Sequence, residues 1–219
     1  MGTITRTFAN NITTSGVFKP TAFNNASFDN VTAVPSGAVE GGNMVLLSTQ
    51  TASSSASVSF TTGIDGTYKE YMFIFNNLHL SNDSAQPQIN FSIDGGSNYN
   101  VTKTSINFSA YHNEGGGATL LGYNGSWDLA QATTPQPLTA NTGNDNDQST
   151  SGFVHLFDPS NTTFVKHFIA TLNNNTSDDY SFNYFIAGYG NTTSAINAVQ
   201  FTVSAGNIDD GTIQMFGIL

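Results

Sequence analysis

Four histidines are the side chains in this sequence best suited to acid–base chemistry near neutral pH: His79, His112, His155 and His167. A nucleophilic triad needs a serine, a histidine and an acid that converge in space, but the sequence has no G-x-S-x-G elbow and no H-E-x-x-H metal motif. In an extended chain, His155 shares a face with Phe153 and Phe157, and His167 shares one with Ile169. We therefore predict core or interface histidines. The alternative is a buried histidine whose titration changes assembly with pH.

Acidic residues occur close together at three places that could help to hold a cation: Asp145 with Asp147, Asp178 with Asp179, and Asp209 with Asp210. Residues 144–147 resemble the start of a calcium loop, which makes Asp145 and Asp147 weak candidates for metal ligands. The run lacks the glycine and the closing glutamate of an EF-hand, so solvated turn carboxylates are the preferred interpretation. No pair of carboxylates is placed to flank a sugar as in a glycosidase. We expect no metal, no cofactor and no enzymatic activity.

Aromatic residues around the segment 124–150 suggest a different function, the binding of a glycan. This segment is rich in Gln, Thr, Pro and Gly, and it holds the single tryptophan, Trp127, shortly after Tyr123. A loop of this length without its own secondary structure is uncommon unless it is functional or disordered. Tyr123 and Trp127 are therefore candidate glycan-binding residues. The alternative for Trp127 is that it covers the edge of the core.

Composition and charge exclude several classes of partner. Only 9% of the residues are charged, and 15 acids outnumber 5 bases. Phosphate neutralisation needs clustered Lys or Arg, so we predict no nucleic-acid binding. No apolar run is long enough to span a membrane, and the N-terminal sequence MGTITRTFANN lacks the apolar segment of a signal peptide. There are no cysteines, so disulfides and thiolate metal sites are excluded.

Alternation of apolar and polar residues predicts an all-β protein from residue 42 to residue 219. Strands are expected over residues 44–51, 55–61, 70–80, 88–93, 105–111, 118–123, 152–157, 163–172 and 180–189, with a final pair over 198–219. Turn residues such as those at 94–96 separate the strands, and no long segment has a helical period. The pattern predicts an antiparallel β-sandwich, jelly-roll-like, in the domain 42–219.

Two stretches make further predictions about packing. Residues 70–80 are largely apolar on both faces, with Tyr71, Phe73 and Phe75 at the odd positions and mostly apolar residues at the even positions 72–78. This strand is therefore expected to be covered on both faces, by a second sheet on one side and by a loop or a neighbouring subunit on the other. Residues 198–219 are expected to form a hairpin with its turn at 206–211. An apolar last strand suggests a C-terminus buried in the domain or at an oligomer axis.

Residues 1–41 differ in residue pattern from the rest of the chain. Isolated phenylalanines stand in polar surroundings without a sustained helical or strand period: Phe8, Phe18, Phe23 and Phe28. Disordered tails are usually poor in aromatic residues. We predict an irregular N-terminal arm whose phenylalanines bind a partner surface, with an arm folded back on its own domain as the alternative.

Several phrases of the sequence resemble virion structural proteins of tailed phages, especially marine phages. They include the opening MGTITRTFANNITTSGVFKPTAFNNASFDNVTAVPSGAVEGGN, then IDGGSNYN, DPSNTTFVKHF, AGYGNTTSAINAVQF and GNIDDGTIQMFGIL. The resemblance covers nearly the whole chain. It lies in the residue composition and in these short segments, and it carries no catalytic residues. It implies a β-sandwich displayed on the particle, as a head decoration, fibre or tail-associated protein, often as a homotrimer.

The first hypothesis is therefore a non-enzymatic virion structural protein, made in the host cytoplasm and attached to the capsid or tail through the arm 1–41. Its partners would be other virion proteins and further copies of itself. The second hypothesis is a carbohydrate-binding adhesin that contacts a host surface glycan through the 124–150 loop. The third is a glycan-cleaving enzyme on the same scaffold.

Overall fold

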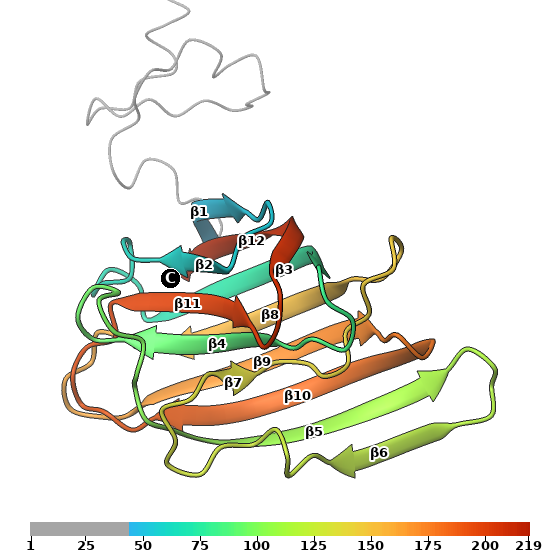
Figure 1. Cartoon of the computed structure of the whole chain (residues 1–219). Coiled ribbons are helices and arrows are strands. Elements are labelled where there is room, and N and C mark those ends of the chain that lie inside the picture. The colour runs from blue at the N-terminus through green and yellow to red at the C-terminus, as the bar shows by residue number, and fades with distance from the viewer. Residues whose placement is uncertain (1–43) are drawn as a thin grey trace, which may run out of the picture. The chain divides into compact units, whose positions relative to one another are not determined.

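A computed structural model describes residues 44–219, which form twelve β-strands and no helix (Figure 1). The strands are β1 Met44–Thr51, β2 Ser57–Phe60, β3 Glu70–Leu80, β4 Pro87–Ser92, β5 Lys103–Asn113, β6 Thr119–Tyr123, β7 Gln136–Pro137, β8 Thr150–Phe157, β9 Lys166–Asn175, β10 Tyr180–Gly190, β11 Ala198–Val203 and β12 Ile208–Ile218. No helix in this part of the chain could cross a membrane. The predicted all-β class is confirmed.

The strands build two antiparallel sheets packed face to face, so the predicted β-sandwich is confirmed as well. One sheet has eight strands in the order β1-β12-β3-β8-β9-β10-β5-β6, and the other has four in the order β2-β11-β4-β7. In Figure 1 the four-stranded sheet lies in front of part of the eight-stranded sheet, and β5 and β6 extend beyond it. The larger sheet is therefore only partly covered by the smaller one.

The connections follow a jelly roll with two inserted hairpins. Without β5, β6, β9 and β10, the remaining strands form the sheets β1-β12-β3-β8 and β2-β11-β4-β7, and the chain passes repeatedly from one sheet to the other. This is the double-sheet, eight-stranded arrangement of a jelly roll. The inserted hairpins β5–β6 and β9–β10 pair with each other through β5 and β10 and widen one sheet.

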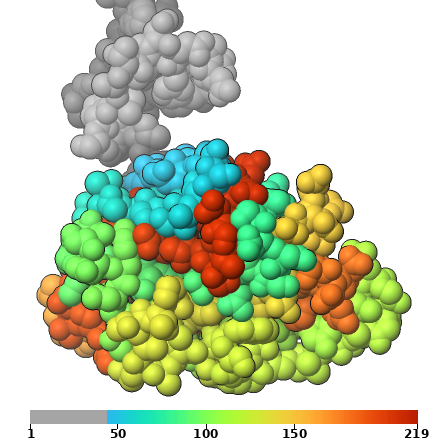
Figure 2. Space-filling view, viewed as in Figure 1, coloured from blue at the N-terminus to red at the C-terminus, as the bar shows by residue number. Residues whose placement is uncertain are grey.

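The segment 124–149 covers the widened part of the larger sheet and is not a free loop. Residues 136–140 are all buried, and β7 pairs with β4. The carbonyl of Ala140 accepts hydrogen bonds from Asn174 Nδ2 at 3.1 Å and Tyr184 Oη at 3.4 Å, which ties the segment to β9 and β10. In Figure 2 the yellow atoms of this segment lie beside those of the four-stranded sheet. Its apolar residues Leu138 and Ala140 explain the burial, because they fill the space over β9 and β10.

Aromatic side chains join the two sheets at the centre of the core. The ring of Phe201 on β11 lies 6.2 Å from Phe60 on β2, 5.4 Å from Phe73 and 4.9 Å from Phe75 on β3, always edge to face. All four side chains are buried. Edge-to-face pairs add to the free energy gained from burial, so this cluster helps to hold the two layers together.

The predicted C-terminal hairpin is wrong. Strand β11 belongs to the four-stranded sheet, whereas β12 lies between β1 and β3 in the other sheet, so the two do not pair. Both strands have the expected alternation, but alternation fixes which side chains point inward and does not choose the neighbouring strand. Ile213 and Met215 are buried as expected, while the last residue, Leu219, is 74% exposed.

A bulge in β3 moves one predicted side chain to the opposite face. The pairing of β3 with β8 shifts between Phe75 and Leu78, and Asn77 adopts a φ of 49°. Leu78 therefore lies on the buried face with Tyr71, not with Met72 as expected from strict alternation. Gly211 on β12 permits the close approach here, since its φ is 105° and an added Cβ would lie 2.5 Å from the Asn77 carbonyl oxygen.

Candidate functional site

The face of the eight-stranded sheet that points away from the four-stranded sheet, called the outer face from here on, is apolar across its width. Cross-strand pairing arranges its side chains in rows. The first row is Leu46, Phe216, Met72, His155, Ile169, Ala187 and Ile106. The second row is Gln214, Ile74, Phe153, Thr171, Phe185, Phe108 and Tyr123. A third row lies on the other side of the first row. It consists of Met44, Ile218, Glu70 and Phe157, followed on β9, β10 and β5 by His167, Tyr189 and Thr104.

Large apolar side chains on this face are exposed to solvent. Leu46 is 52% exposed, Ile106 and Ile169 are each 47% exposed, and Phe153 is 38% exposed. Isolated apolar residues are normal on a protein surface, but a contiguous apolar patch marks an interaction site. The rows form such a patch, because paired strands bring each side chain next to the following one.

The alternation of β5 is inverted relative to an ordinary half-buried strand. Its inward side chains are polar, namely Lys103, Ser105, Asn107 and Ser109, and they are buried under the segment 124–136. Asn124 Nδ2 donates to Asn107 Oδ1 and to Ser109 Oγ, each at 3.0 Å. The apolar Ile106 and Phe108 point outward. A strand that buries its polar side and exposes its apolar side is explained if a further partner covers the apolar side.

Aromatic contacts hold the outer face in a defined shape. The rings of Phe108 and Phe185 stack with centroids 5.0 Å apart. His155 lies 5.1 Å from Phe153 in an edge-to-face contact and stacks on Phe157 at 6.1 Å. These contacts run along β8 and between β5 and β10, so the surface is organised before any partner binds.

The outer face carries almost no charge. The first and second rows contain no Lys, Arg, Asp or Glu. Glu70 in the neighbouring row accepts a hydrogen bond from His155 Nδ1, and both side chains are about three-quarters buried. In a chain with a net charge of −10, this face is a nearly neutral region that can be desolvated at little electrostatic cost.

A hollow interrupts the rows at Ala187. It has a volume of about 440 Å³ and is lined mainly by apolar atoms of Ile106, Ile169, Ala187 and Tyr189. Ala187 pairs with Ile169 on one side and with Ile106 on the other. The short side chain between two long ones leaves a depression that can receive a large apolar group.

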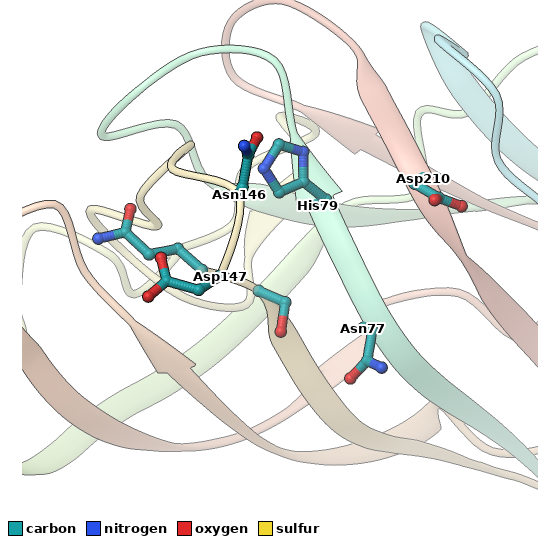
Figure 3. A pocket seen from close by; sticks show the side chains of 7 residues that line it. Asn77, His79, Asn146, Asp147 and Asp210 are labelled. Carbon is teal, nitrogen blue, oxygen red and sulfur yellow. The ribbon is translucent and has the colours of Figure 1, made fainter.

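A second, polar depression lies at the end of β3, and Figure 3 shows the side chains around it. Its volume is about 580 Å³, and it is lined by Asn77 and His79 of β3, Asp210 of β12 and residues 146–149. His79 Nε2 lies 3.2 Å from the carbonyl oxygens of Asn144 and Asp145, so this nitrogen carries the proton and donates. Carboxylates and amides here can bind hydroxyl groups, although no Phe, Tyr or Trp ring lines the depression.

The two candidate glycan-binding residues lie on opposite sides of the sheet. Tyr123 ends the second row of the outer face, is 59% exposed, and donates a hydrogen bond to the Asp128 carboxylate. Trp127 is half-buried and packs against the core, with its ring 6.0 Å from that of Tyr184. They do not form one binding surface, and glycan binding remains a prediction for each of them separately.

The predicted metal ligands and arm residues have different outcomes. Asp145 and Asp147 are exposed, and residues 44–219 contain no group of three His, Cys, Asp or Glu side chains that could hold a metal ion. The arm residues Phe8, Phe18, Phe23 and Phe28 lie outside the described residues. Their binding role therefore stays a prediction.

The histidines predicted to be in the core lie on the outer face. His155 is half-buried and His167 is exposed. The core alternative is wrong for both, because the aromatic and aliphatic neighbours that share their faces point outward too. An interface role remains a prediction for both histidines.

Two buried lysines escaped prediction from the sequence. Lys103 and Lys166 have no exposed surface. Lys103 Nζ donates to Asn90 Oδ1 at 2.6 Å and to the Val101 carbonyl at 2.9 Å, and burial lowers the pKa of Lys103 to about 8. Lys166 Nζ donates to the carbonyls of Phe164 and Thr192 at 2.8 and 3.1 Å. The only feature that could have indicated their burial was their place at inward positions of β5 and β9.

No protein-family model matches the chain. No curated protein matches it either.

Proposed function

We propose that this chain is a non-enzymatic structural protein of a tailed-phage virion, displayed on the particle and attached to the capsid or tail through its arm, residues 1–41. The resemblance of its phrases to virion proteins supports this proposal. The jelly roll supports it by analogy, since this fold occurs in viral capsid and lectin domains. Fold analogy alone does not establish a function, so the surface chemistry has to carry the argument.

The observation that carries the proposal is the apolar outer face. It spans all strands of the larger sheet, from Leu46 on β1 to Tyr123 on β6. A surface of this kind fits protein–protein contact better than the binding of a small ligand, which needs a concave pocket. The protein would then work by packing against other virion proteins and against copies of itself, for which the resemblance favours a homotrimer.

Deleting residues 1–41 is expected to abolish incorporation into phage particles without unfolding residues 44–219. Quantitative mass spectrometry of purified particles from a complemented deletion phage measures this. A full-length chain with Phe8, Phe18, Phe23 and Phe28 replaced by alanine serves as a control for chain length, and we expect it to be incorporated as poorly as the deletion. Incorporation of the truncated chain at the normal level would show that the arm is not the attachment segment.

A second candidate function is glycan binding, and the polar depression at the end of β3 favours it. The end of the 124–150 loop supplies Asn146 and Asp147 to this depression, beside His79 and Asp210. These side chains offer both hydrogen-bond donors and acceptors, which suits the hydroxyl groups of a host surface glycan. The protein could carry this site as a virion component, so the two functions are compatible.

The Asp147→Ala variant is expected to weaken binding to host surface glycans by roughly tenfold or more, because hydrogen bonds to a charged group contribute about 1.5–3 kcal/mol. Binding to isolated host polysaccharide, measured by calorimetry, tests this. Asp178→Ala is the matched control, since Asp178 is also exposed but does not line the depression. Equal glycan binding by both variants would show that the depression is not the glycan-binding site.

A further inference from the structure

We propose that the outer face is covered by a second copy of this chain, packed sheet against sheet. This inference rests on the proposed function in one respect, namely that the outer face is a protein–protein contact. It adds that the partner on this particular face is another copy of the chain and that the two copies pack sheet against sheet.

The size of the face matches what a stable pair requires. Each of the three rows spans seven strands about 4.8 Å apart, and with three outward side chains along a strand this gives a footprint of about 700 Å². Each partner in a standard stable interface buries roughly 800 Å². A single flat partner of the same dimensions covers the whole face, and a second copy of this sheet has those dimensions.

Charge also favours a second copy. A net charge of −10 makes copies of the chain repel each other at most orientations. The first and second rows carry no Lys, Arg, Asp or Glu, so face-to-face packing places the neutral region of one copy on that of the other. Acidic turn residues such as Asp178 and Asp179 lie outside these two rows.

The face has a hollow that an apolar side chain of a second copy can enter. This hollow of about 440 Å³ lies at Ala187, and the face offers large exposed apolar side chains. In a two-fold pair each copy supplies both the hollow and the inserted group. Sheets that pack this way lie about 10 Å apart with strands about 30° from parallel.

Strand order identifies the side chains closest to such a two-fold axis. Strands β8 and β9 are the middle strands of the eight, and His155 and Ile169 pair across them in the first row. Full overlap of two faces puts these residues near their own symmetry mates. A charged side chain at position 169 would therefore be buried in the contact in both copies, and the two like charges would face each other.

The test is the mass in solution of the full-length chain at micromolar concentration, measured by light scattering and native mass spectrometry. We expect a dimer for the wild type, and a monomer for Ile169→Lys, with the dissociation constant raised at least about thirtyfold, the effect of losing an interface hot spot. Ala187→Phe, which fills the hollow without adding charge, is also expected to weaken self-association. Phe164→Lys is the control, because Phe164 is 68% exposed and outside the rows.

Each outcome separates this inference from the proposed function. Loss of a dimer in Ile169→Lys, with the control unaffected, supports a second copy even if the chain is absent from particles, which would overturn the virion role alone. A monomeric wild type whose incorporation into particles is lost in Ile169→Lys overturns the second copy and leaves the virion role intact. An oligomer that persists in both Ile169→Lys and Ala187→Phe also overturns the inference.

Discussion

Replacing Phe201 by alanine is expected to lower the free energy of unfolding by about 4 kcal/mol, the usual range for a buried Phe→Ala change being roughly 3–5 kcal/mol. The side chain is 1% exposed. It touches aromatic rings from both sheets, Phe60 of β2 and Phe73 and Phe75 of β3. Its removal leaves a cavity between the layers that rigid strands on both sides cannot close.

Denaturant unfolding followed by circular dichroism, at one fixed protein concentration, measures this loss. A fixed concentration matters because self-association adds to apparent stability. Phe164→Ala is the matched control, since that ring is 68% exposed and its loss is expected to change the unfolding free energy by less than about 0.5 kcal/mol. A loss below 1 kcal/mol for Phe201→Ala would mean that the two sheets do not meet at this residue.

The protein is expected to become more stable between pH 8 and pH 10 because of Lys103. Burial lowers the pKa of Lys103 from 10.5 to about 8. Above pH 8 the folded chain has lost this proton while the unfolded chain still holds it, so raising the pH favours folding. At about 1.4 kcal/mol for each pKa unit, the gain from this residue is on the order of 2 kcal/mol.

Unfolding free energies of the wild type and of Lys103→Met, measured from pH 7 to pH 10, isolate this effect. We expect the stability of the wild type to rise with pH relative to that of Lys103→Met, whereas Lys69→Met, at an exposed position, keeps the wild-type slope. The range ends at pH 10 because burial raises the pKa of Tyr71 and Tyr184, which gives the opposite slope at higher pH. Parallel pH profiles for the wild type and Lys103→Met would contradict the burial of a charged Lys103.

Much of the strand content could be predicted from alternation, and strand pairing could not. The ranges 44–51 and 70–80 are the bounds of β1 and β3. Alternation reports which side chains of a strand share a face, whereas the neighbouring strand is chosen by contacts distant in sequence. The C-terminal residues show this, because β12 pairs with β1 and β3 and leaves β11 in the other sheet.

The candidate site was only partly predictable for a related reason. Both faces of β3 were expected to be covered, and the apolar outer side of this strand is now seen to continue over the whole sheet. In β5, however, Ile106 and Phe108 point outward and Lys103 and Ser105 point inward. When the side of a strand that faces the interior is polar, the alternation of polar and apolar residues does not show which face of the strand is buried.

The segment 124–150 shows a further limit of composition as a guide. Its many Gln, Thr and Gly residues predicted an exposed loop, yet Gln136 and Thr139 are buried. Gln136 Nε2 donates to the carbonyls of Trp127 and Pro137 at 2.8 Å, so its amide is satisfied without water. Polar residues can line an interior when the fold supplies hydrogen-bond partners, and a sequence does not reveal those partners.

The measurement that bears most directly on an assembly role for the outer face is the copy number of this chain in purified phage particles. Wild type, Ile169→Lys and Phe164→Lys are compared by quantitative mass spectrometry after complementation of a deletion phage. We expect wild-type copy number for Phe164→Lys and roughly a tenth of it or less for Ile169→Lys, because an unpaired charge in a buried interface costs several kcal/mol. Equal copy numbers for all three chains would contradict the claim that the outer face is the surface through which this protein assembles.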